Sequence, residues 1–599
     1  MKLKPRFLSG LLLSIILAVS CSVNRTANTR GEQSEASKYR DLIKYLSSDS
    51  LKGRLTGTPG DSLAAEYIRS RFTSYGLIPV SGDGFQRFKV TDKVVAGNAN
   101  SFVSESRNYI HGIDFEPFSF SENSSLKADV VFTGYGFSIN NDSLKWDDYQ
   151  GQNIKGNWVM ILRGDPEVDN NMSKFSQYNG DRDKALMAKD LGAGGVLLVS
   201  GITFDKDDKF DPLLKGEFSV GIPVLKIKRN LADAILQKSG TNIEEVEKKL
   251  NANRKPASFQ SGVTVEARSE IIQYKTNTRN VIMMLPGDDP VLKKEFVIIG
   301  GHFDHLGMGG PGSGSRAVDT IGVHHGADDN ASGVAMVVEL AGRFAAAKES
   351  HKRSLVFITF TGEEIGLLGS KYFTDNPLID LSKADAMINL DMVGRLKETK
   401  DLQVAGVGTA AGLKELALEY DDTTKLKVYT TEEGSGPSDH SSFYAKNIPV
   451  MFITTGAHVD YHTPSDTWDK INYDGMVSVT DLVYKMAYHL ANDTAKLKFK
   501  EAGPKNTVSR GYRKMRVTLG IMPDVAGVVK NGLRADLVTP GKPAALGGMK
   551  KGDIIISIEG KPVNNIQDYM FRLGQLKPGQ TITVEVLRNN KKEVLVIQL

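Results

Sequence analysis

Five places in the sequence carry side chains that bind metal ions, and each lies at or shortly after the end of a predicted strand or in a loop beside one. They are His302, the Asp328–Asp329 pair, the Glu363–Glu364 pair, Asp391 and His462. The carboxyl ends of parallel strands share one edge of an α/β sheet, so these residues should meet there. Histidine and carboxylate groups are common zinc ligands. Each alone is better explained as an ordinary surface, loop or capping residue, but the five together predict a metal site.

The residue types suit a site for two cations. Neighbouring cations need a shared carboxylate that offsets their repulsion, and a second carboxylate outside the metal shell to take a proton from water. The adjacent Glu363 and Glu364 fit this division of labour. The imidazoles also need hydrogen-bond partners that orient them. We expect these partners to be Asp304 and Asp466, which follow His302 and His462 closely.

The elements that position these residues have an α/β pattern. Continuous apolar runs, which predict buried strands, occur at 280–285, 296–299, 354–360, 386–390 and 449–453. Helical patterns separate several of them. The fold class we predict is therefore α/β, with a mostly parallel or mixed central sheet flanked by helices. A glycine-rich loop at 53–60 lacks the ending of a phosphate-binding loop and is predicted to be structural.

As a set, the motifs resemble the zinc aminopeptidase family that also contains bacterial leucyl aminopeptidases, glutamate carboxypeptidase II and the glutaminyl cyclases. The resemblance covers about 36–492, with peptidase parts at 38–126 and 266–500. It implies two zinc ions per chain. His302 and Asp391 would bind one ion, Glu364 and His462 the other, and Asp329 rather than Asp328 would bridge them.

The resemblance also implies roles for residues outside the ligand set. Glu363 resembles the general base, and Tyr461 resembles a tyrosine that steadies the tetrahedral intermediate. The family suggests a cis peptide bond between Asp329 and Asn330. The motif Ser438-Asp439-His440 resembles a family motif and is expected to be structural or near the substrate. The ligand set is complete without the remaining nearby histidines, which are His305, His324 and His325.

The implied activity is that of an exopeptidase that removes N-terminal residues from peptides, with water activated between two zinc ions and deprotonated by Glu363. Carboxypeptidase or glutaminyl cyclase chemistry on the same scaffold is the alternative among enzymes. A non-catalytic peptide-binding receptor is the alternative from another class, although the complete ligand set argues against it. Neither the residue preferred at the cleaved end nor the oligomeric state follows from the sequence.

Two further modules accompany the peptidase parts. Short β-like runs at 127–265 carry no cluster of chemical residues and resemble a protease-associated domain, which would either wall the active site or only add bulk. Residues 508–599 resemble a PDZ domain, a β-barrel-like fold that adds an extended peptide as a strand. We expect it to bind a peptide or to rest on the catalytic domain. Its predicted peptide-binding loop is Leu519, Gly520, Ile521 and Met522.

The N-terminus resembles a bacterial lipoprotein signal. Lys2, Lys4 and Arg6 precede an apolar run at 8–19, which is too short to span a bilayer, and Cys21 follows small residues. We expect a signal at 1–20, lipidation of Cys21, a flexible tether at 21–37 and a location in the cell envelope. Simple secretion is the alternative. Cys21 is the only cysteine, so internal disulfides are excluded.

The composition sets the remaining limits. A chain of 599 residues should contain several domains. The net charge of +4 gives no reason to expect nucleic acid as a partner. Peptides, and a membrane reached through the N-terminal lipid, are the partners that the sequence predicts.

Overall fold

The computed structural model describes residues 34–599 except 142–143, 168–169, 171–172, 311, 348, 504–516, 524–528, 530 and 540. The predicted signal, Cys21, most of the tether and the first residues of the predicted PDZ-like domain, 508–516, lie outside the described residues. Helix α1 (Glu35–Leu46) begins earlier than expected, because the Ser34 hydroxyl accepts from the amide of Ser37 and caps it. The predicted tether to residue 37 is therefore too long.

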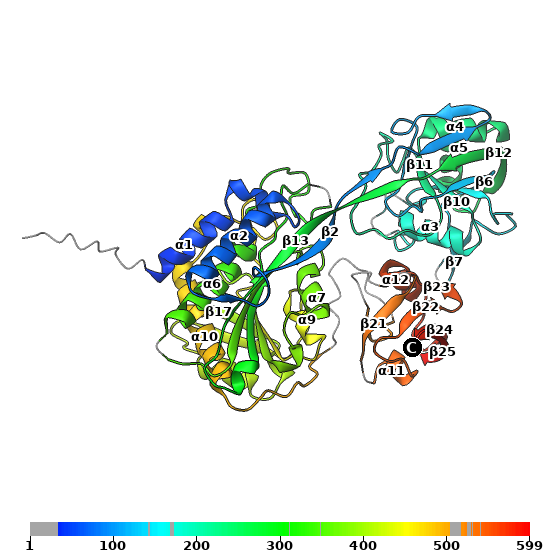
Figure 1. The fold of residues 1–599 in the computed structure, drawn as a ribbon. Coiled ribbons are helices and arrows are strands. Elements are labelled where there is room, and N and C mark those ends of the chain that lie inside the picture. The colour runs from blue at the N-terminus through cyan, green and yellow to red at the C-terminus, as the bar shows by residue number, and fades with distance from the viewer. Residues whose placement is uncertain are drawn as a thin grey trace, which may run out of the picture.

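The catalytic domain contains a nine-stranded sheet in the order β1-β13-β15-β14-β16-β19-β17-β18, with β2 paired to β13 (Figure 1). Its centre is parallel: β14 (Phe296–His302) lies between β15 (Ser354–Phe360) and β16 (Ala384–Leu390), and β19 (Val450–Thr454) follows. Antiparallel pairs flank this centre, so the sheet is mixed, as predicted. The remaining strands are β1 (Ile78–Pro79), β2 (Phe85–Ala96), β13 (Ile271–Leu285), β17 (Asp401–Ala405) and β18 (Lys427–Thr431).

Helices cover both faces of this sheet, which explains why its central strands are apolar throughout. On one face, α1, α2 (Pro59–Ser74), α6 (Gly333–Ala346) and α10 (Tyr473–Asn492) share one hydrophobic cluster with the sheet. On the other face, α7 (Leu368–Asp375) and α9 (His440–Tyr444) share a second cluster (Figure 1). The sheet is thus held rigidly between two apolar layers, and its strand ends are fixed positions for side chains.

The insert has an eight-stranded sheet of its own, in the order β4-β3-β12-β6-β9-β10-β11-β5. This sheet includes β3 (Ser101–Ser104), β4 (Arg107–Tyr109) and β5 (Phe115–Pro117), so the predicted insert boundary at residue 127 falls too late. These three strands are short and only partly buried, which makes their sequences look like loops. The other strands are β6 (Ser125–Thr133), β9 (Trp158–Leu162), β10 (Gly195–Val199), β11 (Val224–Ile227) and β12 (Ser258–Arg268).

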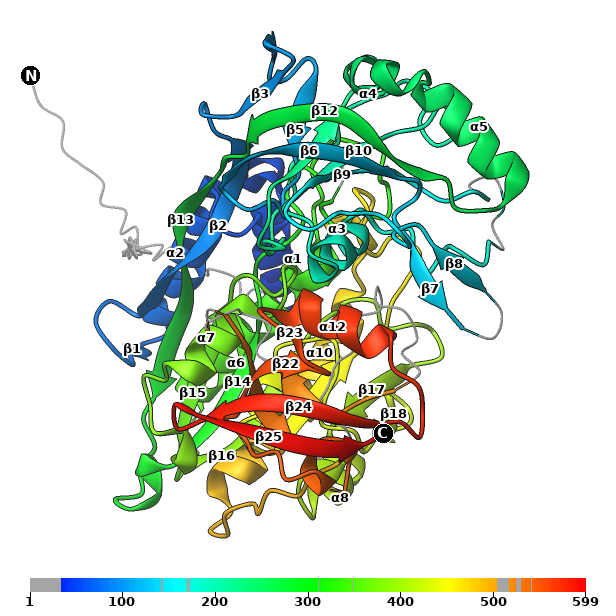
Figure 2. The ribbon, with the colours of Figure 1, turned by 90° about the vertical axis from the view of Figure 1, so that its right-hand side faces the viewer.

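Two long paired strands join the insert to the catalytic domain. β2 and β13 run antiparallel from the pair Phe85–Val281 to the pair Ala96–Ile271, and they form a ribbon between the two bodies (Figure 1). The C-terminal domain has a six-stranded sheet whose main path is β20 (Ile521–Pro523), β21 (Leu533–Val538), β22 (Ile554–Ile558), β24 (Thr581–Arg588) and β25 (Lys591–Gln598). It lies next to the insert (Figures 1 and 2). Among the described residues, no helix is both long and apolar enough to cross a membrane.

Candidate metal centre

Three neighbouring parallel strands deliver candidate ligands to one edge of the catalytic sheet. β14 ends at His302, which pairs in register with Phe360, the last residue of β15. Glu363 and Glu364 follow β15 after a two-residue turn, and Asp391 directly follows β16. The chain after β19 brings His462 to the same edge, and the turn before α6 brings Asp329. The five candidate ligands and Glu363 therefore do come together.

Asp329 lies between two pairs of donors. Its Oδ1 is 3.4 Å from His302 Nε2, and that nitrogen is also 3.4 Å from Asp391 Oδ1. Its Oδ2 is 3.2 Å from His462 Nε2, which is 3.1 Å from Glu364 Oε2. One carboxylate thus presents one oxygen to each pair, which is the arrangement of a bridging ligand.

These separations fit zinc. Zinc–nitrogen and zinc–oxygen bonds of about 2.0–2.1 Å in a tetrahedron place the ligand atoms about 3.3 Å from one another. The four measured separations lie close to that value. In addition, the buried Asp391 Oδ1 accepts no hydrogen bond from any residue that the structure describes, although burial of such an atom is costly. The donor set therefore fits a metal pair.

The electrostatics of the centre are dominated by carboxylates. Burial alone would lower the pKa of His302, but Asp391 and Glu363 outweigh it and raise that pKa well above its usual range. Burial likewise opposes the charged form of His462, yet its hydrogen bonds to Asp329 and Glu364 raise its pKa to about 11. The neighbouring carboxylates thus favour the protonated form of both imidazoles when no metal ion is bound.

The pKa values of the two adjacent glutamates are shifted in opposite directions. Burial raises the pKa of Glu363 well above its usual range, although His302 counteracts part of this effect. Burial also acts on Glu364, but His305 and His462 outweigh it and hold its pKa well below the usual range. Glu363 is 4.0 Å from His302 Nε2, farther than either carboxylate that contacts this nitrogen. Glu364 is thus suited to bind a cation, and Glu363 to exchange a proton.

Comparison with known proteins agrees with this geometry. A model of peptidase family M28 matches residues 280–487, which include all five candidate ligands, and a model of the PDZ domain matches residues 518–599. Residues 280–487 therefore resemble peptidase family M28, and residues 518–599 resemble a PDZ domain.

Relatives of the chain include bacterial and fungal proteins. Aminopeptidase YwaD of Bacillus subtilis is 26% identical over 510 residues, which cover 82% of this chain and 93% of the relative. A probable leucine aminopeptidase of Trichophyton verrucosum is 28% identical over 239 residues, 38% of this chain and 59% of the relative. A probable zinc metalloprotease of Pyrenophora teres f. teres is 36% identical over 148 residues, 24% and 29% of the two chains. The match thus spans less than two thirds of these two fungal relatives.

Two solved structures are also similar to parts of this chain. An aminopeptidase from Aneurinibacillus sp. strain AM-1 is 24% identical, with a TM-score of 0.46, and the match covers 80% of this chain and 97% of that one. Porphyromonas gingivalis glutaminyl cyclase is 21% identical, with a TM-score of 0.31, over 36% and 78% of the two chains.

Of the two residues expected to orient imidazoles in the metal centre, only one contacts its histidine. The backbone carbonyl of Asp304 lies 3.3 Å from His302 Nδ1, and its side chain accepts from the Glu363 amide at 3.1 Å and from the Thr56 hydroxyl at 2.9 Å. The expectation for Asp466 is wrong. Its carboxylate accepts from the amides of Asp328 and Asp329, because the chain between His462 and Asp466 turns back toward that loop.

His462 is oriented instead by the backbone. Its Nδ1 lies 3.1 Å from the carbonyl oxygen of Gly314. The amide of Arg316 donates to the carbonyl of His462 at 2.9 Å, so the loop around residues 313–317 holds the loop around the histidine. The peptide bond between Asp329 and Asn330 is cis, as the resemblance implied.

Two residues to which the sequence analysis gave no role also support the metal centre. His305 is fully buried, and its Nδ1 lies 2.7 Å from Glu364 Oε1, so it supports a ligand rather than standing apart. Arg54 is buried and donates to the carbonyls of Phe303, His325 and Gly326 at 2.7–3.0 Å, which joins the two loops that carry His302 and Asp329. The glycine-rich loop is thus structural, as predicted, and serves the site.

The remaining predicted residues lie near the centre, with one exception. Tyr461 stacks on His462, with ring centroids 3.8 Å apart, and burial raises its pKa above the usual range. Ser438, Asp439 and His440 are fully buried behind the centre, where Ser438 accepts from the Asn389 amide. The exception is the PDZ loop, where the amide of Gly520 donates to the Thr518 hydroxyl at 3.0 Å and so is not presented to a ligand.

The rest of that PDZ loop belongs to its own domain. The side chains of Leu519 and Ile521 lie in the hydrophobic core of the C-terminal domain. Met522 continues strand β20 (Ile521–Pro523). No strand or helix carries residues of both this loop and the metal centre, so the two predicted sites are separate.

Proposed function

We propose that this chain is a zinc-dependent aminopeptidase with two zinc ions per chain. The observation that carries the proposal is the position of the Asp329 carboxylate, one oxygen of which faces His302 and Asp391 while the other faces Glu364 and His462. Two relatives, an aminopeptidase of Bacillus subtilis and a probable leucine aminopeptidase of Trichophyton verrucosum, support attack at the N-terminal end of the peptide.

In this proposal, His302 and Asp391 would hold one ion, Glu364 and His462 would hold the other, and Asp329 would be shared by the two. When bound, the ions supply positive charge that polarises the peptide carbonyl and lowers the pKa of the attacking water. His305, through Glu364, and Asp466, through the Asp329 amide, fix the direction of two of these ligands.

Glu363 is the general base. Burial raises the pKa of Glu363, so its carboxylate, when deprotonated, is a stronger proton acceptor; it takes a proton from the attacking water and then returns that proton to the leaving amine. The hydrogen bond from its backbone amide to Asp304 fixes its position beside His302. Tyr461 remains a protonated phenol at neutral pH, because burial raises its pKa, and it can donate a hydrogen bond to the oxygen that gains charge during attack.

The insert forms part of the wall around the site in this proposal. The loop that orients His462 contains Gly312, and a Cβ placed on that glycine would lie 3.3 Å from the side chain of Leu214 in the insert. The insert therefore reaches the loop beside the metal centre. We also propose that the signal at 1–20 exports the chain and that lipidated Cys21 anchors it in the cell envelope.

The test compares zinc-loaded enzyme on pairs of peptides with the same sequence and either a free or an acetylated N-terminus. We expect loss of the first residue from the free peptides and no cleavage of the acetylated ones, with mass spectrometry as the readout. Removal of C-terminal residues, or conversion of an N-terminal glutamine to its cyclic form without hydrolysis, would contradict the proposal. Tryptic release of a lipidated N-terminal peptide tests Cys21 separately.

A further inference from the structure

The PDZ domain is docked on the insert by one face of a single helix. Helix α12 (Ile566–Gly574) lies against α3 (Asp181–Asp190) of the insert (Figures 1 and 2). Asp568, which is fully buried, pairs with Arg182 at 2.8 Å, and Arg572 pairs bidentately with Asp190. Removing one partner of a buried ion pair is strongly destabilising, so these pairs fix how the two domains meet.

Apolar contact completes this interface. Phe571, on the same face of α12, packs against the hydrophobic cluster of the insert that contains Leu186. The side chain of Gln567 accepts from the amide of Phe218 at 3.1 Å. The residues of α12 that face the PDZ core, Tyr569 and Leu573, belong to a separate cluster. The helix therefore has one face for each domain.

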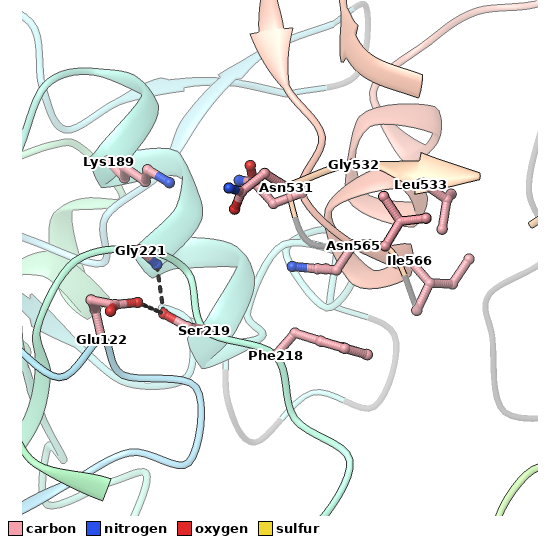
Figure 3. Close-up of a pocket in the computed structure, with 12 residues that line it drawn as sticks. Glu122, Lys189, Phe218, Ser219, Gly221, Asn531, Gly532, Leu533, Asn565 and Ile566 are labelled. Carbon is pink, nitrogen blue, oxygen red and sulfur yellow. Dashed lines mark hydrogen bonds between the residues drawn. The ribbon is translucent and has the colours of Figure 1, made fainter. Parts of the chain in front are cut away.

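A cavity of about 470 Å³ lies at this junction, which is within the range of ligand sites. Residues of both domains line it: Lys189, Phe218 and Ser219 from the insert, and Asn531, Asn565 and Ile566 from the PDZ domain (Figure 3). Neither domain alone would form it, because the insert and the PDZ domain each supply one wall.

Asn565 gives this cavity a hydrogen-bond donor. The residue is only 7% exposed, and its Oδ1 accepts from the amide of Asp568 at 2.9 Å, which caps α12. Its side-chain nitrogen points into the space between the domains (Figure 3) and donates to no residue that the structure describes. Because this nitrogen has no acceptor among the described residues and faces the cavity, a carbonyl oxygen that enters the cavity can accept a hydrogen bond from it.

The cavity lies in line with the outer edge of the PDZ sheet. β20 is the terminal strand of that sheet, and Pro523 at its end pairs with Ala535 of β21 (Leu533–Val538). Leu533, two residues farther along β21, lines the cavity. Because β20 and β21 are antiparallel, the cavity lies beyond the Pro523 end of β20, which is the direction in which a strand added beside β20 would continue.

We propose that the junction between the insert and the PDZ domain is a peptide-binding site. An extended peptide adds beside β20, and its continuing main chain enters the cavity, where Asn565 donates to a peptide carbonyl and Phe218 packs on a side chain. The insert thus extends the contact surface of the PDZ domain. The inference rests on peptide binding by the PDZ domain and not on peptidase activity.

The test uses the full-length protein and an array of N-acetylated dodecapeptides, which lack the free amine that the proposed activity requires. The strongest binders are measured by fluorescence anisotropy against wild type and two cavity variants. Asn565→Ser keeps a side-chain oxygen that can cap α12 but removes the NH2 group that faces the cavity. Phe218→Ala removes the insert's aromatic ring. We expect binding at least 10-fold weaker for Asn565→Ser and at least 5-fold weaker for Phe218→Ala.

Asn242→Ser is the matched control, because Asn242 caps α5 (Ile243–Asn253) of the insert in the same way and does not line the cavity. We expect its binding to equal wild type. Absence of any binder, or unchanged affinity in both cavity variants, would overturn the proposal. Hydrolysis of a free-amine peptide by each variant reports folding, and loss of that activity in wild type would refute the proposed function while leaving peptide binding to be judged by anisotropy.

Discussion

Two sheet edges in this protein are built alike but differ in charge balance. In the insert, β9, β10 and β11 are parallel and fully buried, as β14, β15 and β16 are in the catalytic domain apart from half-buried Phe296. Charged residues follow the strand ends in both. Beyond the insert strands, Arg163 pairs with Asp181 at 2.7 Å and with Asp211 at 2.8 Å. The acids at that edge therefore have fixed cationic partners within the protein.

The catalytic edge has no such partners. Among the residues that the structure describes, no lysine or arginine forms an ion pair with Asp329, Glu363, Glu364 or Asp391; only histidines contact them. Buried carboxylates without compensation are costly, and a bound cation removes that cost. The comparison teaches that parallel strand ends provide position, while the missing basic residues make one edge a metal site.

The largest effect should come from Glu363→Gln. This change removes the proton acceptor without removing a proposed ligand, so we expect kcat to fall about 10³-fold or more while zinc content stays near wild type. Steady-state kinetics and metal analysis on one preparation measure both. Asp181→Asn at the insert edge is the control and should retain activity within about twofold. Turnover close to wild type in Glu363→Gln would refute its role.

Next in size is the loss of the bridge in Asp329→Ala. Both donor pairs lose a ligand, so zinc affinity should fall at least about 100-fold, whereas Asp211→Asn in the insert should leave affinity unchanged. Competition with a chromogenic chelator measures this. If Asp329→Ala bound two zinc ions as tightly as wild type, the two edges would not differ in the way proposed.

A smaller, graded effect is expected from pH. Without metal, His462 has a pKa of about 11 and is protonated at pH 7, but zinc binds the neutral imidazole. Zinc binding must therefore expel this proton, and affinity should rise about tenfold per pH unit for each proton released between pH 6 and 8. Chelator competition across that range checks the slope. An affinity that does not change with pH would contradict the cationic state of the histidines.

The smallest effect on function should follow Arg163→Met. Losing this arginine leaves Asp181 without its partner and should lower the stability of the insert by about 2 kcal/mol, with little contribution from the more exposed Asp211. Denaturant unfolding of the full chain, followed by the fluorescence of Trp158 and its neighbours, measures this. Zinc content and kcat should not change; a loss of zinc would mean that the two edges are coupled.

The sequence was most informative where apolar runs lead directly into chemical side chains. His302, Glu364 and Asp391 could be found because a strand end fixes a residue's place in a sheet, and the family resemblance chose Asp329 over Asp328. The sheet class followed from the same apolar runs. The C-terminal PDZ domain followed from a resemblance of its local motifs to that family.

Contacts between distant loops could not be found in this way. Arg54 binds carbonyl groups about 250–270 residues away, and His305 reaches Glu364 only because two strands are neighbours. Asp466 was misassigned for a related reason: its spacing from His462 says nothing about a loop that turns back. The docking of Arg182 on Asp568 depends on two separate domains and leaves no periodic signal in either sequence.

The ribbon of β2 and β13 has a consequence for how such a chain can be assembled from parts. The insert leaves and rejoins the catalytic domain at Ala96 and Ile271, which are direct partners across two antiparallel strands. Residues paired in this way have Cα atoms about 4.5–5.5 Å apart, a gap that a two-residue hairpin turn closes. A gene could therefore gain, lose or exchange this whole module at a single hairpin tip, without altering any strand of the catalytic sheet.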